Sequence, residues 1–387
     1  MKAYFDNAAT TPLDPRILKA MMPYFKQKFG NASSLHVWGQ EARVAVEGAR
    51  KVVAKVLNCE AEEVIFTGTT TTSDNLAIQG VVGAAQKRGK GDHIITSSVE
   101  HHAVLDTCKA MEKEDFRVAF LPVDKDGMVD PKNVKKAIEK DTVLVSIMYA
   151  NNEVGTIQPI QQIGNLLKTY NKIYFHTDAA AAVDYSDLNV KKLGVDLMTI
   201  GAHKFGGPKG VGVLYVKKRV EIEPLTFGGH HERELWPGTE AVPLIVGMAK
   251  AIEIAAKEKK EALQKVSKLR DKLIKGVLNR VSDSWLTGHP TKRLADIASF
   301  VIKGVEGESL VLALSDKGIA TSTGSACTSS SLSASHVLLA MGIKEEEAHG
   351  SLRISLGKDN TKEEVDYFLE VFPRLVKKLR KMAPKYY

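Results

Sequence analysis

Residues 195–216 read VDLMTIGAHKFGGPKGVGVLYV, and this stretch decides the fold. Its two apolar ends, 195–200 and 211–216, predict buried strands. The turn between them holds four glycines, a proline and the pair His203-Lys204, so it is too rich in glycine to serve packing. Lys204 at the end of a buried strand can be desolvated, lose its proton and attack a carbonyl. A solvated loop lysine is the plainer alternative.

The composition predicts a folded protein with more than one core. The chain has 387 residues, of which 44% are hydrophobic, and this length favours two domains or one large α/β domain with an appendage. No apolar run reaches the roughly 18 residues of a membrane span. The first residues show neither a signal nor a transit pattern, so we expect a cytoplasmic protein without a membrane partner.

The net charge of +8 does not by itself predict nucleic-acid binding. Lysines and acids are interspersed, as in KEKKE at 257–261, and aromatic residues make up only 6%. That pattern is typical of solvated helix faces, with a basic docking patch as the alternative, and we expect no direct nucleic-acid contact. Three cysteines without a CxxC pair predict neither a disulfide framework nor a metal site.

Expected strands and helices alternate from residue 64 onward. The strands are 64–67, 93–97, 118–123, 142–149, 172–177, 195–200 and 211–216, with helices such as 73–87, 103–113 and 160–170 between them. This alternation predicts a mainly parallel seven-stranded sheet covered on both faces, with ligands beyond the carboxyl ends of its strands. A long helix over 243–281 then leads to a smaller α/β unit. We expect a large domain at 15–260 and a small one at 1–14 plus 261–387.

Three polar loops follow other expected strands. Thr70 and Thr71 open a helix, where amides and hydroxyls can hold a phosphate, although an ordinary helix cap explains them equally well. His101 can stack on a planar ring or move protons, unless it is structural. The turn at 151–155 can present the amide of Asn152 to a ligand.

Asp178 follows the expected strand 172–177 and is followed by four alanines. A buried carboxylate needs a cationic partner, which is either a core arginine or lysine or a ligand. One ligand accounts for all of these loops: its phosphate lies at Thr70 and Thr71, its ring under His101, its protonated ring nitrogen beside Asp178, and its aldehyde at Lys204. That ligand is pyridoxal 5′-phosphate (PLP).

The smaller unit adds a cysteine and an arginine. Cys327 lies in the Ser/Thr/Gly-rich segment 321–331, where almost nothing has apolar bulk, so we expect a mobile loop and a reactive thiol. Cys59 and Cys108 lie at or on helices and are interpreted as structural. Arg353, inside the expected strand 352–356, needs an anion, which is either a substrate carboxylate or an internal acid.

The chain resembles the cysteine desulfurases of the NifS/IscS type over nearly its whole length. The matching segments are ATTP at 9–12, FGN at 29–31, SDNLAI at 73–78, EH at 100–101, VSIM at 145–148, NNEVG at 151–155, HK at 203–204, GPKG at 207–210 and GSACTS at 324–329. The resemblance implies the aspartate-aminotransferase fold of PLP enzymes. The long cysteine segment resembles that of the subgroup serving iron–sulfur cluster assembly and tRNA thiolation.

For the cofactor, the resemblance implies a Schiff base at Lys204, with His203 beside it in the binding set. Lys204 or His101 moves protons, while Asp178 keeps the ring an electron sink. Thr239 reaches the phosphate of a neighbouring subunit, which implies a homodimer.

For the substrate, the resemblance implies that free L-cysteine is bound through Arg353 and Asn152, with Asn31 in the same binding set. The thiolate of Cys327 attacks the substrate sulfur, which leaves a persulfide and releases L-alanine. A cluster scaffold or another acceptor protein then receives the sulfur.

The chain also departs from the family pattern. GTTTT at 68–72 stands where the family has SGATE, Ala181 replaces a glutamine that bonds the ring hydroxyl, and Gly201 replaces a serine that binds the phosphate. Ala180 stands where threonine or serine is common. Two cofactor hydrogen bonds are therefore expected to be missing, each worth about 1 kcal/mol. We expect weaker cofactor retention or a differently tuned ring.

Two other functions compete with a desulfurase. A selenocysteine or cystine C–S lyase would use the same cofactor but does not need a nucleophilic thiol at Cys327. A degenerate homologue could act as a sulfur-relay or scaffold protein, which Ala181 and Gly201 would favour. Cofactor absorbance that depends on Lys204 excludes the second alternative.

Overall fold

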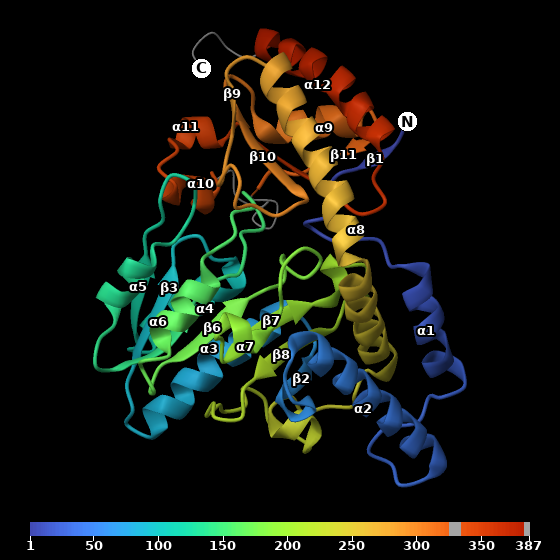
Figure 1. Ribbon diagram of the computed structural model, residues 1–387, viewed down its shortest axis with the longest axis vertical. Helices are drawn as coiled ribbons and strands as arrows, with labels where there is room; N and C mark the ends of the chain where they lie inside the picture. The colour runs from blue at the N-terminus through green and yellow to red at the C-terminus, as the bar shows by residue number, and fades with distance from the viewer. Residues whose placement is uncertain (325–333, 383–387) are drawn as a thin grey trace.

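A computed structural model of the protein describes residues 1–324 and 334–382. The chain is built on a seven-stranded sheet, which lies in the lower half of Figure 1 below a smaller unit. Its strands are β2 (Val64–Thr67), β3 (His93–Ser97), β4 (Arg117–Leu121), β5 (Thr142–Ser146), β6 (Tyr174–Asp178), β7 (Leu197–Gly201) and β8 (Gly212–Val216). This confirms the α/β class and the seven strands predicted from the sequence.

The order of the strands brings their ends together. The order is β2-β8-β7-β6-β5-β3-β4, and β8 runs antiparallel to both of its neighbours while the other pairs are parallel. Because β8 alone is reversed, the carboxyl ends of the other six strands meet at one edge. All residues of β2, β3, β5, β7 and β8 are buried, as expected for strands covered on both faces.

Two layers of helices cover this sheet. One face packs against α1 (Pro15–Lys26), α2 (Val37–Leu57), α5 (Pro131–Ala137), α6 (Ile160–Leu167), α7 (Val190–Leu193) and the first half of α8 (Val242–Arg280). The other face packs against α3 (Thr70–Lys87) and α4 (His102–Lys113). Alternate residues of each strand enter the two cores, because side chains point to opposite faces along a strand.

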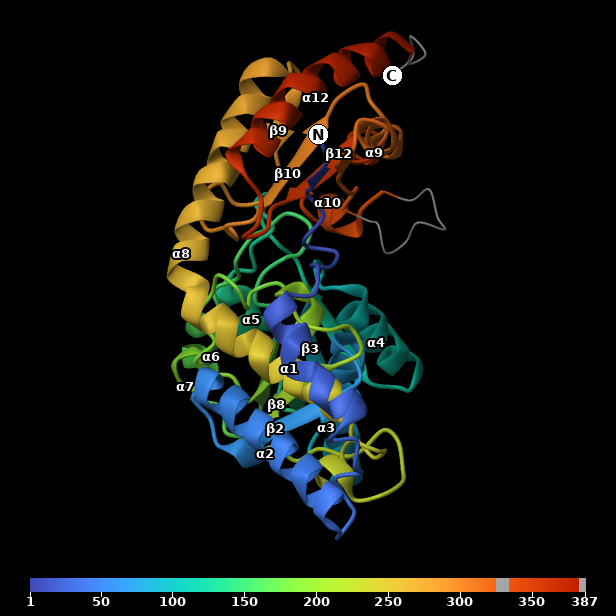
Figure 2. The same cartoon turned by 90° about the vertical axis from the view of Figure 1, so that its right-hand side faces the viewer.

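The smaller unit has its own sheet and core. β9 (Ser284–Leu286), β10 (Ile297–Ile302) and β12 (Ser351–Ser355) form an antiparallel sheet, accompanied by α9 (Gly307–Ser315), α10 (His336–Ala340), α11 (Glu345–Ala348) and α12 (Lys362–Met382). β1 (Ala3–Tyr4) pairs in parallel with β11 (Ile319–Ala320). The N-terminal residues therefore lie beside this unit, as Figures 1 and 2 both show.

The helix α8 belongs to both units. Residues such as Ile245 and Ile252 are buried in the core of the large sheet, whereas Val266 and Leu273 are buried in the core of the smaller unit. Figure 2 shows α8 passing alongside both. We propose that the two units are domains, 15–260 and 1–14 plus 261–387, joined within this helix.

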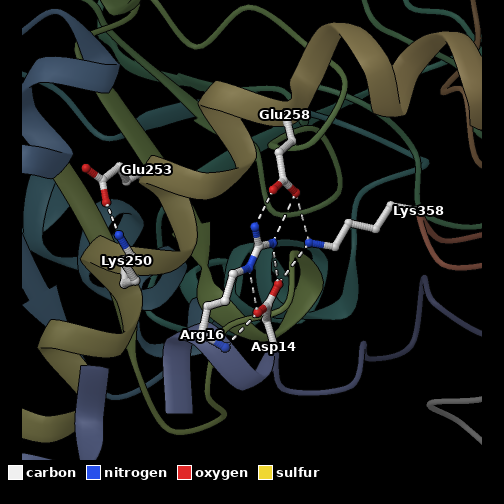
Figure 3. Close-up of polar contacts among 6 residues, drawn as sticks. All are labelled: Asp14, Arg16, Lys250, Glu253, Glu258 and Lys358. Carbon is white, nitrogen blue, oxygen red and sulfur yellow. Dashed lines mark hydrogen bonds and ion pairs between the residues drawn. The ribbon is translucent and has the colours of Figure 1, made fainter. Parts of the chain in front are cut away.

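An ion-pair network lies against the middle of α8 (Figure 3). Nη1 of Arg16 donates to Glu258 at 2.5 Å, and Nζ of Lys358 donates to both Asp14 and Glu258, at 3.0 and 3.2 Å. The Arg16 guanidinium, assisted by Lys358, holds the pKa of Asp14 well below its usual range. The network thereby links the start of α1, the middle of α8 and the segment after β12.

Local structure differs from the sequence prediction at several helix and strand ends. α3 begins at Thr70 instead of residue 73, because Thr69 and Thr72 form a reciprocal capping box in which each side chain accepts the other residue's amide. Thr70 and Thr71 are therefore in the first helical turn. The short elements β9, α5, α7 and α11 were not predicted, since they are too short to show a periodic pattern. Within residues 1–324 and 334–382, no helix is long and apolar enough to cross a bilayer.

Candidate active site

Lys204 lies in the turn η2 (Ala202–Lys204), directly after the carboxyl end of β7. Its Nζ donates to the carbonyl oxygens of Ala8 and Ala9, at 2.5 and 3.0 Å. Thr11 of the same N-terminal segment donates through Oγ1 to the carbonyl of His203 at 2.9 Å. The N-terminal segment therefore holds the turn in which the candidate nucleophile lies.

His203 is half-buried beside this lysine. Its Nδ1 lies 3.3 Å from Oγ1 of Thr10. Burial, followed by the positive charges of Lys204 and Lys209, lowers the pKa of His203 to about 4. The imidazole is therefore neutral at physiological pH.

The loop after β2 brings a threonine to the same strand end. Thr70 is the first residue of α3, and its Oγ1 lies 2.1 Å from the point that a Cβ at Gly201 would occupy. Gly201 is the last residue of β7, three positions before Lys204. Thr71 is exposed in the same helical turn. Thr70 thus belongs to the Lys204 site, with Thr71 at its rim.

His101 is the residue before α4, and its Nδ1 accepts the amide hydrogen of Ala103 at 3.1 Å. Burial lowers the pKa of His101 to about 4, with a further contribution from the positive charge of Lys204. The ring is therefore neutral, and because Nδ1 accepts, its proton is on Nε2. The electrostatic effect of Lys204 means that these two side chains share one site.

Asp178 is the last residue of β6 and is 7% exposed. Its Oδ1 accepts the amide hydrogen of Ala180 at 2.8 Å. Burial raises the pKa of Asp178 to about 6, although the Ala180 amide and Lys204 oppose the rise. A cation placed against this carboxylate would remove the cost of its burial.

Buried acids near Asp178 were missed by the sequence reasoning. Asp74 is fully buried, and neither of its carboxylate oxygens has a hydrogen-bond partner among the described residues. Burial, with a smaller effect from Asp178, raises its pKa well above the usual range, and its Oδ1 is 3.6 Å from Nε2 of His176. Glu100 accepts from the Met148 amide at 3.0 Å, and burial raises its pKa to about 8. The available signal in the sequence was an acid shortly after a buried strand: Asp74 lies in the second turn of α3, which follows β2, and Glu100 lies between β3 and α4.

Arg353 lies in β12 and is 3% exposed. Its Nη2 pairs with Oδ1 of Asp6 at 3.0 Å and its Nη1 donates to the carbonyl of Asn152 at 3.0 Å. The internal acid that the sequence left as an alternative is therefore present. Nε of Arg353 is buried and has no partner within the described part of the chain, so one donor remains for another acceptor.

Two of the predicted site residues, Asn31 and Thr239, lie elsewhere in the chain. Asn31 and Thr239 line an open cavity of about 860 Å³ together with His231 and Glu240, and Lys204 is not part of its lining. The two loops that form it are joined by a contact of 3.2 Å between Ser33 Oγ and His231 Nε2. Within a single chain, Asn31 and Thr239 therefore do not line this cavity together with Lys204.

Two of the three cysteines, Cys59 and Cys108, lie in the described part of the chain, whereas Cys327 lies outside the described residues. Cys59 and Cys108 are free thiols, and burial raises the pKa of each to about 12, so neither supplies a thiolate at neutral pH. Thr321 and Ser322 at the start of the cysteine segment are buried, and Ser322 exchanges two backbone hydrogen bonds with Arg353.

Comparison with known proteins places this site in a family. Residues 3–368 match the aminotransferase class-V family. The chain is 52% identical over 381 residues to "Cysteine desulfurase IscS" of Methanosarcina thermophila, which covers 98% of this chain and 93% of that protein. The solved structure of a "NIFS-LIKE PROTEIN" is 41% identical, with a TM-score of 0.92 and coverage of 98% of this chain and 100% of the other. The structure "SspA in complex with cysteine" is 33% identical, with a TM-score of 0.82 and coverage of 93% and 100%.

The chain therefore belongs to the class-V aminotransferase family of PLP-dependent enzymes. Within that family its function is that of a cysteine desulfurase. Both conclusions agree with the resemblance drawn from the sequence.

The residues present fit PLP. The first turn of α3 and the hydroxyl of Thr70 form an anion site, because amides at a helix start have no partner within the helix. A buried carboxylate at Asp178 and an amine at Lys204 lie at neighbouring strand ends. Ala181 lines a small cavity of about 20 Å³ with Lys204, which is room for about one water. When bound, the cofactor supplies an electron sink for reaction at the Cα of the substrate.

Proposed function

We propose that this protein removes sulfur from L-cysteine and retains it as a persulfide on Cys327. The Cβ–S bond of cysteine breaks, an S–S bond forms to Sγ of Cys327, and the thiol proton is used in forming L-alanine. Atoms and electrons balance without an added oxidant. The observation that carries this proposal is the position of Asp178 and Lys204 at the carboxyl ends of the paired strands β6 and β7. The positive charge of Lys204 also acts on the pKa of both His101 and Asp178, which indicates that the three side chains face one site.

The side chains divide the work by their protonation states. Nζ of Lys204 holds the cofactor and moves the Cα proton of the substrate. His101 presents the N–H of Nε2, which a neutral ring can donate as a hydrogen bond at physiological pH. Asp178 pairs with the protonated ring nitrogen, and His203 packs beside the lysine. Thr70 and Thr71 bind the phosphate with the first-turn amides of α3.

Arg353 and Asn152 bind the substrate carboxylate in this proposal. The unpartnered Nε of Arg353 supports it, because a buried donor without an acceptor is costly. Asp6 already neutralises much of the guanidinium charge, so the substrate either shares the arginine or displaces Asp6.

The test is the reaction itself. After L-cysteine is added, alanine and persulfide are measured for the wild type, Cys327→Ala and the matched control Cys59→Ala. We expect alanine formation coupled to persulfide formation only when Cys327 is present. Cys59→Ala should form both products at the wild-type rate. Persulfide-free turnover in Cys327→Ala at the wild-type rate would identify a plain lyase instead.

We propose that the active form is a homodimer, in which Asn31 and Thr239 complete the partner's site. Large apolar side chains are exposed on the two loops that carry these residues and on the start of α2: Phe29, Leu35, Val37, Trp38 and Phe227. Self-association would bury them. Light scattering should report a dimer for the wild type and for Leu312→Asp, an exposed residue of the other unit, and a weakened dimer for Phe227→Asp. A monomeric wild type with full activity would refute the proposal.

We propose that the sulfur passes to a protein acceptor in the cytoplasm, either an iron–sulfur cluster scaffold or an enzyme of tRNA thiolation. The resemblance of the cysteine segment 324–329 supports this. Transfer of ³⁵S from labelled Cys327 to each purified acceptor would separate the two, and transfer to neither would refute both.

A further inference from the structure

Gly201 and Thr70 compete for one volume at the end of β7. A Cβ added to Gly201 would lie 2.1 Å from Oγ1 of Thr70 and 3.4 Å from its Cβ. The backbone does not require glycine at this position, because its φ of −126° and ψ of 125° suit any residue. Gly201 is therefore explained by space and not by conformation: a side chain here is incompatible with the hydroxyl of Thr70.

The hydroxyl of Thr70 is available for a ligand. Thr69 and Thr72 satisfy each other through the capping box, but Oγ1 of Thr70 makes no hydrogen bond with any residue in the described ranges. It projects over the strand end that leads into Lys204, at the start of an 18-residue helix. An anion bound at this helix start would thus meet the hydroxyl as well as the amides.

We propose that Thr70 supplies the phosphate-binding hydroxyl that the sequence had led us to expect to be missing at position 201, and that Gly201 is needed to admit it. The inference rests on the proposed binding of PLP at Lys204. It changes the expected consequence of Gly201, since the hydrogen bond is relocated from β7 to α3 and not lost. Of the two cofactor hydrogen bonds expected to be missing, only the one at Ala181 is then left without a replacement.

A double-mutant cycle tests the exchange. PLP and pyridoxal are titrated separately into the cofactor-free protein, and their dissociation constants are determined from absorbance and fluorescence. The unfolding temperature of each cofactor-free variant is also measured. Thr70→Val, which keeps the shape and removes the hydroxyl, should weaken PLP binding about 10- to 100-fold, because a hydrogen bond to a charged group is lost. Pyridoxal has no phosphate, so its affinity should stay within about twofold.

The reciprocal variants report on the shared volume. Gly201→Ser should weaken PLP binding and lower the unfolding temperature of the cofactor-free protein, because its side chain overlaps Thr70. Adding Thr70→Ala to Gly201→Ser should restore both, bringing PLP affinity to within about threefold of the wild type.

Three outcomes would overturn the inference: unchanged PLP affinity in Thr70→Val, equal weakening of PLP and pyridoxal binding, or a Gly201→Ser/Thr70→Ala double variant that binds PLP no better than Gly201→Ser. Failure of the wild type itself to bind PLP would instead refute the proposed function.

Discussion

Asp178 is expected to destabilise the cofactor-free protein, and Asp178→Asn should reveal it. Burial raises the pKa of this carboxyl from 3.8 to about 6. At 1.36 kcal/mol per unit, this rise corresponds to about 3 kcal/mol. Well below pH 3.8 the group is protonated in both the folded and the unfolded state, so its burial has no electrostatic cost. Above pH 6 it is ionised in both, and the folded state carries the full cost.

The measurement is urea unfolding of cofactor-free protein between pH 4.5 and 8. The asparagine keeps the oxygen that accepts from Ala180, so the fold should tolerate it. We expect Asp178→Asn to exceed the wild type by up to about 3 kcal/mol at pH 8, and the difference to shrink as the pH falls toward 4. Asp316→Asn, at the exposed end of α9, is the control and should show little dependence on pH.

When PLP is bound, the wild type should be more stable than Asp178→Asn, since the wild-type carboxylate then gains a cationic partner. If Asp178→Asn binds PLP as tightly as the wild type does, the proposed pairing of Asp178 with the cofactor is contradicted. A cofactor-free variant that is less stable than the wild type at pH 8 would refute the argument from burial.

Four other substitutions test separate parts of the structure, and Glu47→Gln among them is the exposed control for Glu232→Gln. Glu232→Gln leaves Arg50 buried without its bidentate partner, which now lies at 2.8 Å through both oxygens, and should cost about 3–5 kcal/mol in urea unfolding. Glu47→Gln removes the exposed partner of the same arginine and should cost less than about 1 kcal/mol. Lys358→Met opens the network on α8 and should lose at most about 1 kcal/mol, a difference that fades in 1 M salt. Ala181→Gln should tighten PLP binding about fivefold if it adds one hydrogen bond, whereas weaker binding would mean that the cavity cannot hold the longer side chain.

The fold was predictable because its sheet consists of many buried strands that alternate regularly with helices along the sequence. Six of the seven expected strands agree with the observed strands to within two residues at each end, whereas the expected strand 142–149 extends three residues past the observed end of β5 at Ser146. Buried parallel strands are near-continuous apolar runs, which the sequence shows directly. The start of α3 differs from the predicted residue 73 because four consecutive threonines have no apolar periodicity, so the sequence pattern does not reveal the capping box formed by Thr69 and Thr72.

The site was predictable only in part. Lys204, His101 and Asp178 end or follow strands whose order could be guessed, so their proximity followed from the fold class. The pairing of Arg353 with Asp6 joins residues 347 positions apart and leaves no local signal. The close approach of Thr70 to Gly201 likewise joins two separate elements, β7 and α3, and leaves no local signal in the sequence. It suggests that the phosphate-binding hydroxyl is moved from position 201 to Thr70 and is not lost.

The pairing of β1 with β11 also constrains how the chain is made. Ala3 and Tyr4 leave the ribosome roughly 300 residues before Ile319 and Ala320, the residues with which they pair. At about 5–20 residues per second, the first strand waits roughly 15 to 60 seconds for its partner. During that interval Ala8 and Ala9, which accept from Lys204, are attached to a segment without its final anchor. The lysine turn can therefore acquire its native surroundings only near the end of synthesis, so a nascent chain completes its large sheet before it can complete its active site.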